Sequence, residues 1–407
     1  MKLRRTLGAI ALIVLACLIA PTAQAADHAA LERQFEAWIV SDVWPEAERA
    51  GVARNVFDAA FAGVTLDWKL PDLAPPSASE GQAEFRSPAA YFDAARIEAM
   101  VRTGRLKLKE WSTALAAIEK HYGVPAPVIV AIWGRESGFG AATLSHSAIR
   151  VLATGAFLGR RKDLFRSELI AALKILQAGD VKVADLTSSW AGALGQPQMM
   201  PSQFLRYAVD FDGDGRRDIW TSVPDSLASI AGALSAQGWD RKRNWSFEIE
   251  LPAAVACSLD GPDQGKPIAD WAGLGVKRKD GTPLPQSKLV GFLLMPAGRF
   301  GPAFLVSQNF YTLKAYNNSD LYALYILHLA DRFSDDHGFV APWGDIGHFT
   351  RASVAAMQKR LQAEGYDVGG TDGLVGYKTR IAVGKWQAKA GKPVTCYPDA
   401  AMLADAR

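Results

Sequence analysis

A single carboxylate follows an almost wholly apolar segment of the chain. Residues 127–133 read PVIVAIW and lead through Gly134 and Arg135 to Glu136. A proline-started apolar helix must be buried, and it delivers Glu136 at its C-terminal end, where the helix dipole disfavours an anion. Burial against Trp133 also disfavours the charged form, so we expect the pKa of Glu136 to rise toward the range of a general acid. The alternative is that Glu136 only pairs with Arg135 or another cation at a frayed helix end.

A second group of side chains has the spacing of metal ligands. Residues 210–218 read DFDGDGRRD and fit the first nine positions of an EF-hand loop, with glycine at the required sixth position. Position twelve is Thr221 rather than an acid, and we expect Asp225, at the start of the next helix, to replace it. The alternatives are that Asp225 only forms a capping box with Ser222, or that the loop is a solvated acidic turn. The predicted calcium ligands are Asp210, Asp212, Asp214, Arg216 and Asp225.

The composition is that of a folded, exported protein. The chain has 407 residues, of which 49% are hydrophobic and 21% charged, so long disorder is excluded and two or three domains are expected. Residues 1–25 combine basic residues, an apolar run and the sequence AQA, which predicts a secretory signal cleaved before Ala26 and a periplasmic location. The alternative is a lipoprotein whose anchor is Cys17. The basic residues of this segment account for the whole net charge of +3, so nucleic acid is not expected as a partner.

Hydrophobic periodicity predicts an α+β protein that is mainly α. Apolar residues recur at helical spacing through the first half of the chain, and the period changes to two over about 245–312, which predicts a small β insertion. Another helix is predicted over 319–332. The helices predicted before the insertion are 27–62, 88–100, 106–122, 128–135, 163–177, 201–207 and 226–236.

The end of the chain is predicted to be a separate helical domain. Residues 336–345 lack periodicity and are predicted to be a linker to residues 346–407, which we call the tail. Gln358, Asp372-Gly373 and Thr379 stand in an order that resembles the small peptidoglycan-binding domain of many wall enzymes. The alternative is a helical cap whose glycines serve only turns. Because the tail has its own apolar helices, we expect wall binding and chemistry to be separable.

Five further blocks resemble the B-type lytic murein transglycosylases. They are IWGRESGFG at 132–140, SSWAGALG at 188–195, QMMPS at 198–202, YAVDFDGDG at 207–215 and YNNS at 316–319. The resemblance implies a lysozyme-like catalytic domain over residues 26–335, with Glu136 as the sole catalytic acid and base. It also implies that the β-1,4 bond between N-acetylmuramic acid and N-acetylglucosamine in peptidoglycan glycan strands is cleaved without water, which leaves 1,6-anhydro-N-acetylmuramic acid. A structural calcium ion is implied as well, and no organic cofactor is expected.

The same resemblance assigns the sugar-binding residues by motif position. They are Ser189, Gln198, Met199, Tyr316, Asn317 and Tyr322. Ser189 and Gln198 would lie beside the reacting ring, and Tyr322 near Glu136. Without the resemblance, Ser189 reads as a helix N-cap and Tyr322 as a core aromatic. The sequence departs from the family at Gln196-Pro197, where tyrosine and glycine often stand, and at Met199, where an aromatic residue is common.

Two other function classes would use the same residues. A hydrolytic muramidase would need a second carboxylate beside Glu136, which the linear sequence does not locate. A non-catalytic wall-binding protein would depend on the tail alone. Cys257 and Cys396 would meet an oxidising compartment, but their spacing does not show whether they pair.

Overall fold

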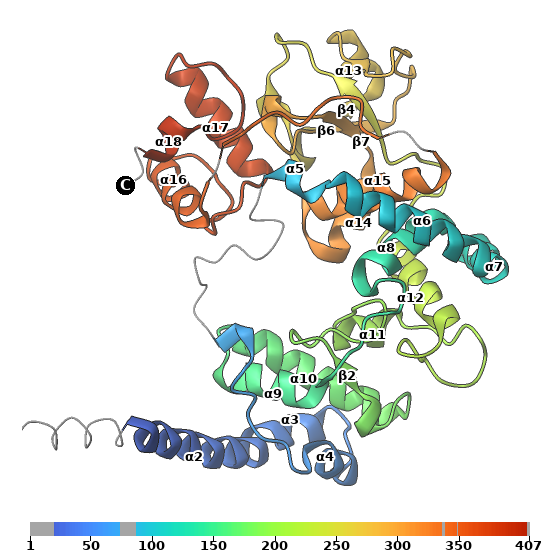
Figure 1. Cartoon of the computed structure of the whole chain (residues 1–407), viewed down its shortest axis with the longest axis vertical. Coiled ribbons are helices and arrows are strands. Elements are labelled where there is room, and N and C mark those ends of the chain that lie inside the picture. Colours follow the sequence, from blue (N-terminus) through green and yellow to red (C-terminus); the bar gives the residue numbers. More distant parts are fainter. Residues whose placement is uncertain (1–19, 74–86, 336–337, 348, 405–407) are drawn as a thin grey trace, which may run out of the picture. The chain divides into compact units, whose positions relative to one another are not determined.

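The computed structural model describes residues 20–73, 87–335, 338–347 and 349–404 (Figure 1). The chain forms two compact units, one of residues 1–75 with 143–206 and the other of residues 76–142 with 207–407. Most of the predicted export signal lies outside the described residues. Its last part, from Ala20, belongs to the first described helix, α2 (Ala20–Trp38).

The first unit is almost wholly helical. Its centre is a helical hairpin in which Gly155 of the first helix approaches the second so closely that a Cβ there would lie 2.6 Å from the ring of Phe165. The two-stranded ladder of β1 and β2 opens the loop that contains Ser189. Its helices after α2 are η1 (Ile39–Val43), α3 (Trp44–Arg49), α4 (Arg54–Phe61), η2 (Pro71–Leu73), α9 (Ala148–Leu158), α10 (Lys162–Ala178), η4 (Val183–Asp185) and α11 (Pro201–Tyr207), and its strands are β1 (His146–Ser147) and β2 (Thr187–Ser188).

The second unit is built around one buried helix, α8 (Ala126–Ser137). Every residue from Val128 to Gly134 of this helix is buried, and α6, α12 and α15 pack against it. An apolar run without a polar side is stable only when other elements surround it. The helices of this surrounding shell are α5 (Pro88–Tyr91), α6 (Ala94–Glu110), α7 (Ser112–Tyr122), α12 (Val223–Ala236), α14 (Gln308–Asn317) and α15 (Asp320–Ser334).

A five-stranded antiparallel sheet lies between α12 and α14 in the chain, in the order β4-β6-β7-β3-β5. Strand β7 is buried on both faces: Phe304 and Val306 join the helical core, while Ala303 and Leu305 join a second apolar cluster. This alternation follows from the period of two in a strand. The strands are β3 (Ser246–Glu250), β4 (Lys266–Pro267), β5 (Lys277–Arg278), β6 (Val290–Leu294) and β7 (Ala303–Val306), and the short helices between them are η5 (Cys257–Leu259), η6 (Pro262–Gln264), α13 (Ile268–Gly273) and η7 (Gly298–Phe300).

The tail contains three helices, α16 (Arg351–Ala363), α17 (Tyr377–Lys389) and α18 (Ala400–Ala404), around a small apolar cluster of their own. The buried amide of Gln358 fixes its long turn, because Nε2 donates to the Leu374 carbonyl (2.8 Å) and Oε1 accepts from the Gly373 N–H (2.8 Å). Thr379 also accepts from this amide (3.1 Å). Gln358, Gly373 and Thr379, which carry the resemblance, therefore form hydrogen bonds with one another in the interior of the tail.

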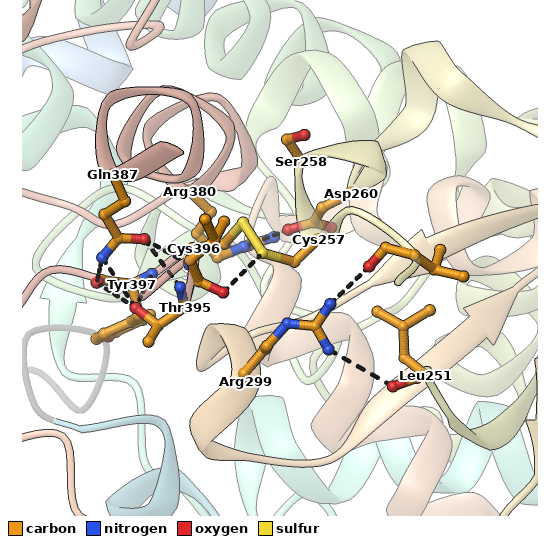
Figure 2. The surroundings of a disulfide bond; sticks show 12 residues. Leu251, Cys257, Ser258, Asp260, Arg299, Arg380, Gln387, Thr395, Cys396 and Tyr397 are labelled. Atoms are coloured by element: carbon orange, nitrogen blue, oxygen red, sulfur yellow. Dashed lines mark hydrogen bonds and ion pairs between the residues drawn. A yellow bond between two sulfur atoms is a disulfide. The ribbon is translucent and has the colours of Figure 1, made fainter. Parts of the chain in front are cut away.

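The tail is covalently joined to the sheet region. Cys257 and Cys396 form a disulfide with an S–S distance of 2.06 Å (Figure 2). The side chain of Gln387 accepts from the N–H groups of Thr395 (2.9 Å) and Cys396 (3.0 Å), and so holds the cysteine in a left-handed conformation with φ 55°. The Arg299 N–H donates to the Thr395 carbonyl (2.9 Å). The pairing of Cys257 and Cys396, which the sequence left open, is thus present and joins the tail to the sheet region in addition to the linker.

The described residues of the predicted linker, 338–345, contain no helix or strand, yet they pack on the second unit. The Glu248 carboxylate accepts from the N–H groups of Val340 (2.9 Å) and Ala341 (2.7 Å). The Trp343 ring stacks on Phe92, with ring centroids 5.2 Å apart. The segment is therefore fixed at several points along its length.

The predicted helices need correction in two places, and the predicted β insertion in one. We expected a break over 101–105, but α6 runs through it, because Gly104 serves close packing on Phe333 of α15. Helix α9 was not predicted, since eight of its eleven residues are buried and it lacks a polar face. The predicted β insertion includes the start of α14, and the sheet itself ends at Val306.

No single helix among the described residues has the length and apolar composition needed to cross a membrane. Helices α7 and α8 meet those criteria only as a pair bent by 112°.

Two mid-helix glycines should respond in opposite ways to alanine. At Gly104 a Cβ would lie 2.2 Å from the ring of Phe333, which is 6% exposed and cannot move away, so Gly104→Ala should cost about 1–3 kcal/mol of unfolding free energy. At Gly232 in α12 the nearest atom to a Cβ would be the Tyr207 carbonyl oxygen at 3.5 Å. Gly232→Ala should therefore stabilise by up to about 1 kcal/mol. Urea denaturation measures both, and a stabilising Gly104→Ala would contradict the packing role.

Candidate active site

Helix α8 ends in an unusual turn directly after Glu136. Gly138, Phe139 and Gly140 all have positive φ, at 58°, 61° and 81°. Glycine adopts this conformation freely, whereas phenylalanine does so only under local constraint. The Ser137 hydroxyl supplies part of that constraint, since it donates to the Trp133 carbonyl (3.1 Å) and accepts from the Gly140 N–H (3.0 Å).

The turn folds Phe139 back over its own helix. The rings of Trp133 and Phe139 meet edge to face, with centroids 5.7 Å apart. A Cβ on Gly134 would lie 2.6 Å from the Phe139 ring, so glycine is required there. The apolar side of the site is thus built from the same helix that carries Glu136.

The Glu136 carboxylate accepts a side-chain hydrogen bond from α15. The Tyr322 hydroxyl donates to Oε1 at 2.5 Å. Tyr322 is fully buried, and the Ser319 hydroxyl caps α15 by accepting from the Tyr322 N–H (3.2 Å). Glu136 itself is half-buried, so the carboxylate combines a dry surrounding with access from outside.

The Arg135 guanidinium does not neutralise Glu136 by direct pairing. Its Nη2 donates to the Tyr91 hydroxyl (3.1 Å), and it lies over the rings of Tyr91 and Tyr325 at 5.4 and 5.6 Å. The alternative interpretation of Glu136 as a partner of Arg135 at a frayed helix end is therefore wrong.

These surroundings favour the protonated form of Glu136. Burial raises the pKa of the Glu136 carboxyl, and the Tyr322 hydrogen bond and the more distant Arg135 charge only partly oppose it. Burial and the negative charge of Glu136 raise the pKa values of Tyr316 and Tyr322 well above that of a free tyrosine. Both phenols therefore stay protonated at neutral pH, and Tyr322 acts as a hydrogen-bond donor.

The structure brings three of the predicted site residues together. Tyr316 lies near the end of α14, within electrostatic range of Glu136, and Tyr322 follows at the start of α15. Asn317 is the last residue of α14 and is exposed. The left-handed Asn318, with φ 51°, ends the helix and sets the direction of the short connection.

The other predicted sugar-binding residues belong to a loop of the first unit. The Ser189 hydroxyl accepts from the Ala193 N–H (3.2 Å), and Gln198 Nε2 donates to the Gly195 carbonyl (2.9 Å). These bonds hold a compact loop, in which Met199 pairs with Leu194 and is only 2% exposed. The side chain of Met199 thus packs inward here, and the sugar contacts of the three predicted loop residues stay predictions.

Two aromatic residues near Glu136 were missed from the sequence, as was an exposed tryptophan in the loop of the first unit. Tyr91 and Tyr325 orient Arg135, but no local pattern connects them to Glu136. Trp190, beside Ser189, is 42% exposed and offers a flat apolar surface. The exposure of Trp190 could have been predicted from the sequence, because its neighbours in the loop are small residues that cannot bury a tryptophan ring.

The predicted metal loop has its three alternating carboxylates close together. Oxygens of Asp210, Asp212 and Asp214 all lie within 4.8 Å of one another. Asp225 is fully buried and accepts from the N–H groups of Phe211 (2.8 Å), Asp212 (3.2 Å) and Asp218 (2.9 Å), so it organises the loop backbone.

One half of the predicted capping box is present. Ser222 caps α12, since its hydroxyl accepts from the Asp225 N–H at 3.3 Å, but the Ser222 N–H donates to the Asp218 carbonyl at 3.2 Å. The Arg216 guanidinium pairs with Asp214 at 2.9 Å, in an exposed position. Glycines at 213 and 215, with φ 80° and 89°, let the loop wrap around its centre.

A cavity of about 1060 Å³ lies between the tail and the junction of α14 and α15. Its lining includes Asn318 and Asp320 from the junction and Arg351, Asp372 and Tyr377 from the tail. The lining combines charged groups of both signs with apolar side chains, which suits a ligand that has polar and apolar faces.

The chain belongs to the transglycosylase SLT domain family, whose match spans residues 34–331. Residues 350–404 match the family described as a putative peptidoglycan binding domain. The resemblance to the B-type lytic transglycosylases and the expected fold, a mainly helical, lysozyme-like domain with a small sheet and a helical tail, are thereby confirmed.

Three relatives illustrate the similarity. The membrane-bound lytic murein transglycosylase B of Escherichia coli is 30% identical over 238 residues, which are 56% of this chain and 62% of that protein. The match therefore spans less than two thirds of this relative's length. SltB3 from Pseudomonas aeruginosa, in complex with NAG-anhNAM-pentapeptide, has a TM-score of 0.83 and 41% identity over 92% of this chain and 99% of that chain. The Escherichia coli lytic transglycosylase Slt35, in complex with calcium, has a TM-score of 0.53 and 28% identity over 61% of this chain and 77% of that chain.

The Tyr322 hydrogen bond can be tested through the pKa of Glu136. Tyr322→Phe removes a donor that stabilises the carboxylate, so the pKa of Glu136 should rise further. NMR titration of the labelled glutamate side chain measures this directly. The control Tyr366→Phe removes a phenol from the tail and should leave the value unchanged, whereas an unchanged or lower value in Tyr322→Phe would contradict the assigned geometry.

Proposed function

We propose that the protein is a lytic murein transglycosylase. It cleaves the β-1,4 bond between N-acetylmuramic acid and N-acetylglucosamine and forms 1,6-anhydro-N-acetylmuramic acid. The observation that carries the proposal is the Glu136 carboxylate at the end of a buried helix, whose pKa burial raises and to which the Tyr322 hydroxyl donates. The complex of SltB3 with a ligand that contains an anhydro sugar supports it.

Glu136 performs both proton transfers in this reaction. The protonated carboxyl gives its proton to the leaving glycosidic oxygen, and the resulting carboxylate accepts the proton of the 6-hydroxyl as that oxygen closes on the anomeric carbon. Because the nucleophile belongs to the same sugar, no water needs to be positioned and the entropic cost of the second step is low. The Tyr322 hydroxyl occupies Oε1 and stabilises the ionised intermediate state, which leaves Oε2 for the moving proton.

A hydrolytic muramidase is the alternative function. A retaining or inverting hydrolase needs a second carboxylate near the first. The raised pKa of Glu136 has burial as its cause, and the Tyr322 hydrogen bond and the Arg135 charge oppose it.

The substrate is proposed to be peptidoglycan glycan strands in the periplasm. Ser189, Gln198, Met199, Tyr316 and Asn317 are proposed to contact the sugars, and the cavity of the tail is proposed to hold the wall polymer. The disulfide suits an oxidising compartment. We propose export through a signal cleaved before Ala26, with lipidation at Cys17 as the alternative.

A calcium ion is proposed for the acidic loop. The donor groups of the loop fit this ion. Oxygens of three carboxylates lie within 4.8 Å of one another, and carboxylate oxygen is a ligand that calcium prefers. Asp210, Asp212 and Asp214 would hold the ion with the backbone of Arg216, and Asp225 would support them from the interior. The ion would stabilise the loop and has no role in the proton transfers. The calcium complex of Slt35 supports this assignment.

The catalytic proposal predicts the products of a defined variant. Glu136→Gln should fold but lose at least about 100-fold in activity, because it can neither donate nor accept the proton. Mass spectrometry of digested sacculi reads the outcome, since an anhydro end is one water lighter than a hydrolysed end. Glu110→Gln, which changes an exposed glutamate paired with Lys107, is the control. Hydrolysed ends from the wild type would identify a muramidase, and no released fragments would favour a wall-binding protein.

The metal proposal predicts a calcium-dependent stability. Calcium at about 100 times its Kd should raise the unfolding free energy by about 2.7 kcal/mol relative to chelator. Asp212→Asn should abolish most of this response, whereas Asp280→Asn, in an exposed turn of the sheet region, should keep it. Coincident melting curves with chelator and with calcium would rule the site out.

A further inference from the structure

One arginine of the tail is buried against the catalytic part of the second unit. Arg380, on α17, is 2% exposed. Its Nε pairs with Asp260 Oδ2 at 2.5 Å and its Nη2 with Asp320 Oδ2 at 3.1 Å. Nη1 donates to the Val375 carbonyl at 3.2 Å. Figure 2 shows Arg380 reaching Asp260 beside the disulfide.

A buried charge of this kind is stable only while its partners are in place. Taking a guanidinium and a carboxylate out of water is costly, and the cost is offset only by close, hydrogen-bonded pairing. Burial would raise the pKa of Asp320, but Arg380 and Lys314 outweigh it and lower that pKa. Asp320 is therefore ionised, and its position is tied to two cations.

Asp320 connects these cations to the active site. It is the first residue of α15, two positions before Tyr322, and the adjacent Ser319 caps the same turn. Its Oδ1 pairs with Lys314 of α14 at 2.8 Å. Tyr316 follows Lys314 by two residues, in the last turn of α14. Asp320 thus joins the tail to both helices that present tyrosines to Glu136.

Two further contacts fix the position of the tail beside this ion pair. The disulfide joins Cys257, three residues before Asp260, to Cys396. The backbone at Gly298 approaches the tail so closely that a Cβ there would lie 2.2 Å from the Thr395 carbonyl oxygen. Arg380 is therefore presented to Asp260 and Asp320 from a fixed surface.

We propose that Arg380 is a positioning residue for the catalytic centre: by holding Asp320, the docked tail fixes the first turn of α15 and keeps the Tyr322 hydroxyl on Glu136. This inference rests on the proposed function for its meaning, since it assigns the tail a part in catalysis in addition to wall binding. It predicts that chemistry and tail are not separable in this chain.

The test compares two substitutions that break the same buried cluster on different sides. Asp320→Asn weakens the ion pair between Arg380 and the first turn of α15, and Asp260→Asn weakens the ion pair between Arg380 and the sheet region. Both are made in the full-length, disulfide-bonded protein, together with Arg380→Met and the conservative Arg380→Lys. Each variant is examined for melting temperature, for the NMR pKa of Glu136, and for kcat and KM on soluble glycan fragments.

The positioning role gives a distinct pattern of results. Asp320→Asn and Arg380→Met should lower kcat between about 10-fold and 100-fold with little change in KM, as expected when a catalytic group is displaced by about 1 Å. Both should raise the pKa of Glu136, in the direction expected for Tyr322→Phe, because the phenol no longer holds the carboxylate. Asp260→Asn should lower the melting temperature but leave the pKa of Glu136 and kcat close to wild type. Arg380→Lys should recover part of kcat.

A double variant excludes an independent effect. Adding Arg380→Met to Tyr322→Phe should lower kcat no further, because both act through one hydrogen bond. If Arg380→Met does not fold, Asp320→Asn and Arg380→Lys carry the same comparison.

The proposal is overturned if Asp260→Asn and Asp320→Asn change kcat and the pKa of Glu136 alike, or if neither changes them. The pKa measurement needs no activity. An inactive wild type therefore refutes the proposed function alone, and an unaltered pKa in Asp320→Asn refutes the positioning role.

Discussion

The short hydrogen bond between Tyr322 and Glu136 is the contact on which the site depends. A carboxylate at the C-terminal end of an apolar helix is opposed by the helix dipole, by about 0.3–1 kcal/mol, and by the loss of water. One donor from α15 offsets part of that cost without removing the raised pKa. A stronger partner, such as the Arg135 guanidinium, would ionise the acid and deprive it of its proton. Tyr91 and Tyr325 instead hold the Arg135 guanidinium through a hydrogen bond and ring contacts.

Because this bond joins two helices, its length depends on how those helices are packed. Helix α8 is fixed by burial along nearly its whole length and by the three left-handed residues that end it. The start of α15 is held by the buried residues Tyr322 to Leu324 and by ion pairs of Asp320 with Lys314 and Arg380. Salt bridges are directional, so they define the orientation of a helix end more narrowly than apolar contacts do. The tail thus adds a directional constraint to the first turn of α15.

The sequence was informative where a local pattern implied burial. The apolar run before Glu136 located both the central helix and its carboxylate, and the alternating acids located the loop around Asp212. Helix α9 was missed because burial on all sides removes the polar face that marks a helix. The partners of Arg380 lie 60 and 120 residues away in the chain, and the two cysteines are 139 residues apart. Such pairs are set by the packing of whole domains, on which local periodicity carries no information.

The disulfide has a further consequence for the integrity of the chain. Residues between Cys257 and Cys396 form a covalently closed ring that contains strands β4 to β7, helix α15 and most of the tail. A protease that cuts once inside this ring, including in the segment between α15 and α16, leaves both fragments in a single molecule. In an oxidising environment rich in proteases, the enzyme would lose its tail only after reduction as well as cleavage.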